Sequence, residues 1–417
     1  MTRRNHHEFN SRRSRTVNVL VAALVMMLSV LSLIGVQSSG EALISNVRAD
    51  EAPDSPLYRV TFADEKSVTR TIDARVLLTA QDGGLLLEGR DGKLWTVGSK
   101  QLEKNELTDE TFQPLPADQL GKQLQQELIE FGIKSPSEII QTKHYVICST
   151  AGRKYGEWVG GLFERLHDAF HAYWKEEELN LHEPEFPLTA FVLKDQTEFV
   201  QLATKHDGPD AAVSKGYFSI ETNRIVMFDL SATQNSVPAK SFDEIRQKMR
   251  KSPFNVATVI HEATHQIAFN SGMHTRFADN PVWLTEGMAM FFEVPDLESH
   301  SGWKSVGKMN PSRLTRFRDS LKQRGDGASL ATLIQTDDRL KDVTVAETAY
   351  AESWALTYYL IKNRKADYVA YLKTLQNKPR LKAGTPEERL NDFRKAFGDD
   401  WENLERDLKR WPVWRSK

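Results

Sequence analysis

The chain of 417 residues contains a single cysteine, Cys148. An internal disulfide and a cysteine-based zinc cluster are therefore excluded, and a bound metal would need histidine and carboxylate ligands. Cys148 ends an apolar run at residues 145–148, which is typical of a strand, and we expect a small buried side chain there. A nucleophilic role would need a histidine partner, and the sequence points to none.

The chain also lacks an excess of charge of either sign. Its 55 Lys and Arg against 57 Asp and Glu give a formal net charge of −2. No basic field favours nucleic acid, so we expect no nucleic-acid partner. With 40% hydrophobic and 27% charged residues the chain resembles a globular protein rather than a disordered one. Its length fits two or three domains, and no repeat of solenoid length is present.

The N-terminal segment has the pattern of an export signal. An uncharged stretch at residues 17–36 follows five arginines, Arg3, Arg4, Arg12, Arg13 and Arg15. As a helix this stretch would rise about 30 Å, enough to cross a bilayer. Residues 47–49 (Val-Arg-Ala) offer a cleavage site, so a cleaved signal peptide and a retained membrane anchor both stay open. Either predicts that residues 50–417 lie outside the cytoplasm, as a periplasmic, secreted or outward-facing anchored protein.

The exported part is predicted to have the α+β fold class. Loosely alternating apolar residues with Asp-Gly turns indicate strands near the start, and the polar residues 99–118 are interpreted as a linker. Helical spacing and short apolar runs alternate in the centre, and the end is mostly helical. The expected parts are an address segment at 1–49, a small antiparallel β unit at 50–103, a linker and helix at 104–140, a central region with a small mixed sheet at 141–300 and a helical lobe at 301–417.

One short motif points to metal chemistry. His261-Glu262-Ala263-Thr264-His265 lies inside a predicted helix at residues 255–269. Positions four apart lie about 40° apart around a helix axis, so both imidazoles can face one ion. Two neutral imidazoles suit zinc, and Glu262 between them can reach the attacking water. Two solvated histidines on a surface helix are the alternative.

A third ligand is expected on the next predicted helix, residues 282–293, which Asn280 and Pro281 would open as cap and first residue. A catalytic zinc usually takes three protein ligands and keeps one position for water. Glu286 lies 21 positions after His265, a length that lets the second helix fold back against the first. Glu293, one heptad later, is the less favoured rival.

Other histidine arrangements fit less well. A metzincin pattern would place a third histidine six residues after the second, with a glycine between, but Ala268 and Ser271 occupy those positions. His274 lies off that spacing. His167 and His171 are also four apart, but no helix with a further ligand follows at once, so we interpret them as polar residues of an amphipathic helix rather than as a metal site.

At Pro281, Trp283 and Glu286-Gly287 the chain resembles the gluzincin superfamily of metallopeptidases, especially the peptidase-MA-like group, which includes bacterial families of unknown function. The resemblance covers roughly residues 140–365 and is specific around 255–295. It implies a zincin-like catalytic domain and an exported peptidase that cleaves a peptide or protein substrate. One Zn²⁺ per chain would be held by His261, His265 and Glu286, with Glu262 as general base.

The resemblance also implies further site residues. A tyrosine from a later segment commonly stabilises the oxyanion, and Tyr350 is the expected one, with a core position for this side chain as the alternative. Substrate would lie along an edge strand formed by Arg224, Ile225, Val226 and Met227. Two other functions remain open: a non-catalytic envelope protein that binds a partner on a zinc-stabilised fold of this type, and a structural exported protein without metal.

Overall fold

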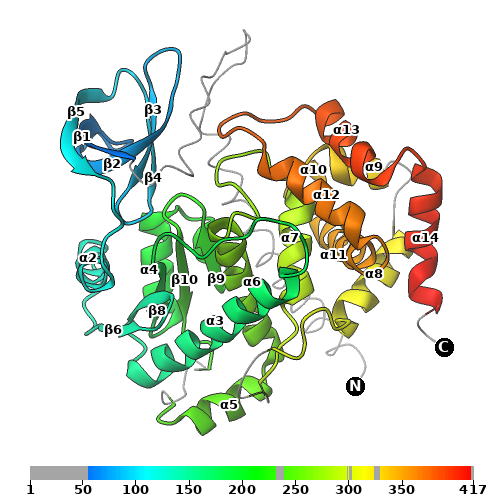
Figure 1. The fold of residues 1–417 in the computed structure, drawn as a ribbon. Helices are drawn as coiled ribbons and strands as arrows, with labels where there is room; N and C mark the ends of the chain where they lie inside the picture. The colour runs from blue at the N-terminus through cyan, green and yellow to red at the C-terminus, as the bar shows by residue number, and fades with distance from the viewer. Residues whose placement is uncertain (1–54, 232–238, 298, 300–302, 324–328, 415–417) are drawn as a thin grey trace.

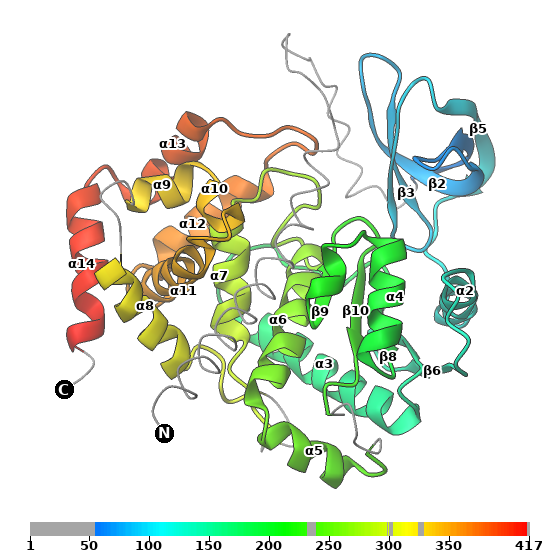
Figure 2. The same ribbon diagram turned by 180° about the vertical axis from the view of Figure 1, so that it is seen from behind.

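The computed structural model describes residues 55–231, 239–297, 299, 303–323 and 329–414. The uncharged stretch at 17–36 and the cleavage site at 47–49 lie outside the described residues. Among the described residues, no helix combines the length and the apolar character that crossing a membrane requires. The fold is α+β, as predicted, with an N-terminal β unit, a central sheet covered by helices and a helical lobe at the other side (Figures 1 and 2).

The N-terminal β unit is a five-stranded antiparallel sheet in the order β4-β3-β2-β1-β5. Its strands are β1 (Pro56–Ala63), β2 (Thr69–Thr79), β3 (Leu85–Gly89), β4 (Leu94–Val97) and β5 (Leu102–Thr111). The predicted linker at 99–118 is therefore wrong, because most of β5 pairs with β1 there. Most residues of β5 are exposed and polar, so this edge strand carries no hydrophobic alternation and depends on backbone pairing.

Buried charges attach the β unit to the rest of the chain. Glu88 on β3 accepts hydrogen bonds from Arg75 on β2 and from Arg276, which lies 188 residues later in the chain. Asp91, in the turn after β3, pairs with Arg224 at 2.9 Å. Charges buried in this way are costly unless each has its partner, so these pairs fix one docking geometry.

The central sheet is mixed, in the order β6-β7-β8-β10-β9. Its strands are β6 (Glu138–Gln141), β7 (Tyr145–Ser149), β8 (Leu188–Leu193), β9 (Gly216–Ser219) and β10 (Arg224–Phe228). β10 runs parallel to β8 and antiparallel to β9, so it is an internal strand. The expectation that residues 224–227 form a free edge is wrong, and β9 is the edge strand instead. A hairpin pattern does not reveal which of its two strands joins the sheet.

Helices cover both faces of the central sheet. α3 (Arg153–Trp174) and α6 (Pro253–Asn270) pack in one hydrophobic cluster with inward residues of β7, β8 and β10. α2 (Ala117–Glu130) and α4 (Gln196–His206) pack on the opposite face, where Cys148 is fully buried as predicted. The large cluster continues from α6 into the C-terminal helices, so the sheet and the helical lobe share one core.

Beyond β10 the helices predicted at 255–269 and 282–293 are present with small shifts at their ends, and the described part of the C-terminal region is mostly helical, as predicted. α6 and α7 (Val282–Phe292) lie side by side, and α11 (Ala346–Asn363) packs against α7. The other elements are a 3-10 turn at Ala211–Val213, α5 (Phe242–Arg250), α8 (Pro311–Gln323), α9 (Leu330–Gln335), α10 (Asp338–Lys341), α12 (Lys365–Gln376), α13 (Pro386–Phe397) and α14 (Trp401–Trp414).

Candidate metal centre and cleft

The helix α6 is held against the sheet by apolar and polar contacts. Val259, Ile260, Ala263 and Ile267 are buried, as the apolar spacing of this segment requires. The Gln266 amide donates to the carbonyl oxygens of Thr189 and Asn223 at 2.9 Å each, which links the helix to the sheet. Both motif histidines are buried, with His261 7% and His265 2% exposed, so the alternative of two solvated histidines is wrong.

The helix α7 begins differently from the sequence prediction. Asn280 donates to the carbonyl oxygens of Thr275 and Ala278 and does not cap α7. Pro281 occupies the cap position, and the Val282 amide donates to Asp337 Oδ1 at 3.0 Å. This carboxylate lies 55 residues away in sequence, which is why no local pattern indicated it. Trp283, fully buried, stacks on Tyr371 with 6.0 Å between ring centroids and anchors the start of the helix.

The residue after Glu286 permits a close contact between α7 and α11. A Cβ atom at Gly287 would overlap the Thr357 hydroxyl and would lie 2.8 Å from the Ser353 carbonyl oxygen. Only a glycine lets the two helices approach this closely. The Glu-Gly pair therefore combines a ligand with the packing that places it.

His261, His265 and Glu286 converge on one point, as their spacing predicted. The two Nε2 atoms lie 3.1 Å apart, and Glu286 lies 3.1 Å from His261 Nε2 and 3.4 Å from His265 Nε2. Zinc bonds of 2.0–2.1 Å in tetrahedral geometry put ligand atoms roughly 3.3 Å apart. The donor set and its spacing therefore fit a zinc ion with three protein ligands.

The electrostatics of this centre suit a cation. Burial opposes ionisation of Glu286, yet His265 and His261 outweigh it and hold its pKa well below the usual range. Burial also disfavours charge on His261, but the carboxylates of Glu286 and Glu293 outweigh that effect and raise its pKa to about 10. Burial lowers the pKa of His265. A proton on His261 thus supplies positive charge that a metal ion would replace.

Glu293 supports the centre from behind. Its carboxylate lies 3.6 Å from His261 Nδ1, on the opposite side of the ring from Glu286. Arg313 binds both oxygens of Glu293 at 2.7 and 2.8 Å, and Asn310 donates to one of them. A carboxylate behind a ligating imidazole orients the ring and raises its basicity. From the sequence, Glu293 was expected only as a rival ligand to Glu286, and no local pattern indicated Arg313.

Glu262 lies beside the three converging residues as a buried carboxyl group, 6% exposed. Its Oε2 accepts a hydrogen bond of 3.0 Å from the Phe218 amide on β9. Burial and the charge of Glu286 raise the pKa of Glu262 to about 7, although His261 acts in the opposite direction. A carboxyl group with a pKa near the operating pH is well matched to both accepting and returning a proton.

A cleft of about 420 Å³ opens onto these residues. His261, Glu262 and Glu286 line it together with side chains from α6, the turn after α7 and the start of α8. The walls beyond the charged groups are largely apolar and include Pro253, Phe254, Ala257, Val294 and Pro295. Gly216 of the edge strand β9 also lines the cleft, so a sheet edge, an apolar wall and the converging ligands meet in one place.

The remaining predicted residues lie elsewhere. Residues 224–227 are absent from the cleft lining, and Arg224 is 1% exposed and pairs with Asp91 and Glu127, so it stabilises the structure. Tyr350 on α11 is 1% exposed, and burial together with Glu286 and Glu262 raises its pKa well above the usual value. Tyr350 does not line the cleft. His274 is buried outside the group of converging ligands.

Comparison with known proteins adds one finding about this region. No curated protein matches the chain. Residues 255–382 match a family described as "Protein of unknown function (DUF1570)". The matched span contains the whole candidate centre, from His261 on α6 through Glu286 on α7 to Tyr350 on α11. The part of the chain similar to that family is therefore the part that builds the centre and its supporting helices.

Proposed function

We propose that the protein is an exported zinc-dependent peptidase of the gluzincin type. The observation that carries the proposal is the convergence of His261, His265 and Glu286 within 3.1–3.4 Å, with the carboxyl group of Glu262 beside them in a cleft. A purely structural protein would have no need of three buried glutamates around two histidines, because each buried charge costs stability. A binding protein would have no need of a base.

The chemistry follows from the positions of the side chains. When bound by His261, His265 and Glu286, zinc would polarise the scissile carbonyl and lower the pKa of a water to about 7. Glu262 takes a proton from the attacking water and later gives it to the departing amine. Because the Phe218 amide holds Oε2 of Glu262, we assign the proton to Oε1. Glu293 and Arg313 keep His261 in its ligating orientation.

The edge strand β9 supports a peptide as the substrate class. The Phe218 amide that reaches Glu262 lies on β9, and Gly216 of the same strand lines the cleft. An extended peptide can add to such an edge through main-chain hydrogen bonds, with side chains accommodated by the apolar wall. Residues 224–227 were expected to bind the substrate, but they form the internal strand β10. We therefore propose that the neighbouring edge strand β9 of the same hairpin binds it.

Tyr350 is the proposed donor to the oxyanion that forms when water attacks. Tyr350 is buried on α11, and burial together with the carboxylates of Glu286 and Glu262 raises its pKa, so its hydroxyl stays protonated at neutral pH. A neutral hydroxyl donor in a water-poor site is suited to stabilise developing negative charge.

The decisive variant is Glu262→Gln in the full chain, assayed against a broad peptide library together with its zinc content. We expect unchanged zinc and a loss of turnover of at least 100-fold, because the amide cannot take a proton. Glu65→Gln, at an exposed position on the β unit, serves as the matched control and should cleave like the parent. Turnover near the parent value in Glu262→Gln would refute the assignment of the base.

A further inference from the structure

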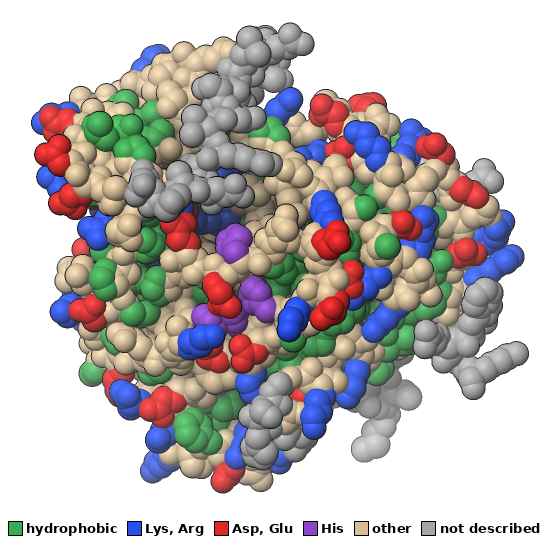
Figure 3. Space-filling view, in the orientation of Figure 1, with side chains coloured by type: hydrophobic (Ala, Val, Ile, Leu, Met, Phe, Trp, Pro, Cys, Tyr) green, Lys and Arg blue, Asp and Glu red, His purple; other side chains and the backbone are tan. Residues whose placement is uncertain are grey.

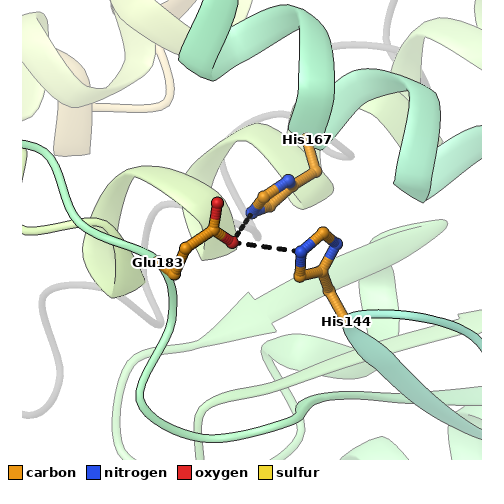
Figure 4. A group of neighbouring side chains, drawn as sticks. All are labelled: His144, His167 and Glu183. Carbon is orange, nitrogen blue, oxygen red and sulfur yellow. Dashed lines mark ion pairs between the residues drawn. The ribbon is translucent and has the colours of Figure 1, made fainter.

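A second group of histidine and glutamate side chains lies outside the candidate centre. It joins three segments: His144 immediately before β7, His167 on α3, and Glu183 in the connection from α3 to β8 (Figure 4). Both imidazoles point at the Glu183 carboxylate. On the face that the space-filling view shows, histidines gather with acidic side chains beside them (Figure 3). No residue is shared with the centre formed by His261, His265 and Glu286.

The distances within this group fit a metal ion. The same oxygen of Glu183 lies 3.0 Å from His144 Nε2 and 3.7 Å from His167 Nε2. The two imidazole rings stack with 3.8 Å between centroids. The three ligand atoms lie within 4.8 Å of one another. Tetrahedral zinc requires separations of roughly 3.3 Å, so small side-chain adjustments would suffice.

His167 is the strongest indication that a ligand belongs here. It is 1% exposed, and neither ring nitrogen has a hydrogen-bond partner within the described part of the chain. The Asp168 carboxylate is 3.8 Å from Nδ1, beyond hydrogen-bonding distance. Burying an imidazole without partners costs free energy unless something else binds it. His167 thus lies on the buried side of the amphipathic helix α3, where an ordinary polar residue would leave both ring nitrogens without partners among the described residues.

His144 is oriented as a ligand would be. Its Nδ1 lies 2.7 Å from Glu164 Oε2, and its amide donates to the other oxygen of the same carboxylate at 2.7 Å. The ring is thereby fixed with Nε2 facing Glu183 and His167. A carboxylate behind an imidazole whose other nitrogen meets the metal is the usual arrangement around ligating histidines. The same arrangement places Glu293 behind His261 in the first centre.

The group is accessible from solvent, and a third imidazole lies next to it. The Glu183 side chain is 67% exposed, so an ion can enter from solvent and a water can hold the position left by the protein. His171, one helical turn after His167, has its ring centroid 4.5 Å from that of His167 and a buried Nε2 without a hydrogen-bond partner among the described residues.

We propose that His144, His167 and Glu183 bind a second divalent metal ion, most suitably Zn²⁺, which fixes the connection between α3 and β8. Two imidazoles and one carboxylate are a donor set that zinc accepts. The connection also carries Glu185, which pairs with Arg75 of the β unit at 2.6 Å. An ion bound by Glu183 would thus fix the α3–β8 connection, which contacts the β unit through Glu185 and Arg75. The role is structural and does not depend on the proposed peptidase activity.

The test is the zinc content of the full chain, stripped of metal with a chelator, reloaded with Zn²⁺ and dialysed. Glu183→Ala removes an exposed ligand of the proposed second site with little risk to the hydrophobic core. His144→Ala removes another ligand of the same site. Glu286→Ala removes the first centre, and Glu176→Gln, an exposed residue of the same connection, is the control. Thermal unfolding with and without Zn²⁺ is recorded for each variant in the Glu286→Ala background.

We expect two zinc ions per chain in the parent and in Glu176→Gln, one in Glu183→Ala and in Glu286→Ala, and none in the double variant. In the Glu286→Ala background zinc should raise the unfolding temperature, and addition of Glu183→Ala or His144→Ala should abolish the rise. Unchanged zinc content in both Glu183→Ala and His144→Ala would overturn the second site. One zinc in the parent that Glu183→Ala removes and Glu286→Ala retains would support this site and refute the first centre instead.

Discussion

The contact between α7 and α11 makes Gly287→Ala an informative perturbation of the candidate centre. The new Cβ would overlap the Thr357 hydroxyl and lie 2.8 Å from the Ser353 carbonyl oxygen, so the helices must separate. Overpacking typically costs about 1–3 kcal/mol, and because this overlap reaches backbone as well as side-chain atoms we expect the upper end, about 3 kcal/mol. Alanine returns roughly 1 kcal/mol through its higher helix propensity. The net loss in the free energy of unfolding should be about 2 kcal/mol.

The same change should weaken zinc binding, because the displaced helix segment carries Glu286. Urea unfolding and competition with a zinc chelator measure the two effects. Gly161→Ala is the matched control: this glycine is exposed on α3 and its Cβ would meet no atom within 4 Å. The control should gain up to about 1 kcal/mol and keep its zinc affinity. A Gly287→Ala variant as stable as the parent, with undiminished zinc affinity, would refute the packing argument.

Three further outcomes follow from the structure. Tyr350→Phe should lower kcat by 10-fold or more with zinc content unchanged, because the donor to the oxyanion is lost; an unchanged kcat would assign the tyrosine to packing alone. Zinc binding at pH 7 should release at least one proton, because the pKa of His261 is raised to about 10 against the opposing effect of burial and this imidazole must lose its proton to bind the metal. Calorimetry in buffers of different ionisation enthalpy measures the number of protons released. Zinc binding without proton release would contradict the assignment of a positive charge to His261. Burial lowers the pKa of His274 to about 3, so on acidification His274 takes up a proton in the unfolded chain before it does in the folded protein, and the free energy of unfolding of the metal-free protein falls as the pH drops from about 6.5 toward 3. His274→Gln should reduce the slope of the unfolding free energy against pH in this range by about 1.4 kcal/mol per pH unit. An unaltered slope would contradict the assignment of this pH dependence to His274.

Local patterns predicted much of the candidate centre. The four-residue spacing of His261 and His265 placed both imidazoles on one face of a helix, because helix geometry fixes such relations. Glu286, on the next helix, was expected from the length of the connection and from the resemblance to the gluzincins. Apolar runs likewise predicted the strand at 145–148 and the helices at 255–269 and 282–293 within a few residues. Each of these inferences used only residues close together in sequence.

Contacts between distant segments were not predictable in this way. The polar strand β5 depends on backbone pairing with β1, and Asp337, between α9 and α10, accepts a hydrogen bond from the first residue of α7. Arg313 reaches Glu293 from 20 residues away, and the pairing of the hairpin with β8 makes β10 internal. His144, His167 and Glu183 meet only because the sheet, α3 and the following connection pack together.

The most direct test of the account is whether His261, His265 and Glu286 hold zinc. The measurement is zinc per full chain by mass spectrometry for the parent, His265→Ala, Glu286→Ala and the exposed control Glu65→Ala. We predict that each of the first two variants contains one zinc fewer than the parent, while Glu65→Ala matches it. Equal zinc content in the parent, His265→Ala and Glu286→Ala, all folded and supplied with metal, would contradict the metal centre and with it the proposed peptidase.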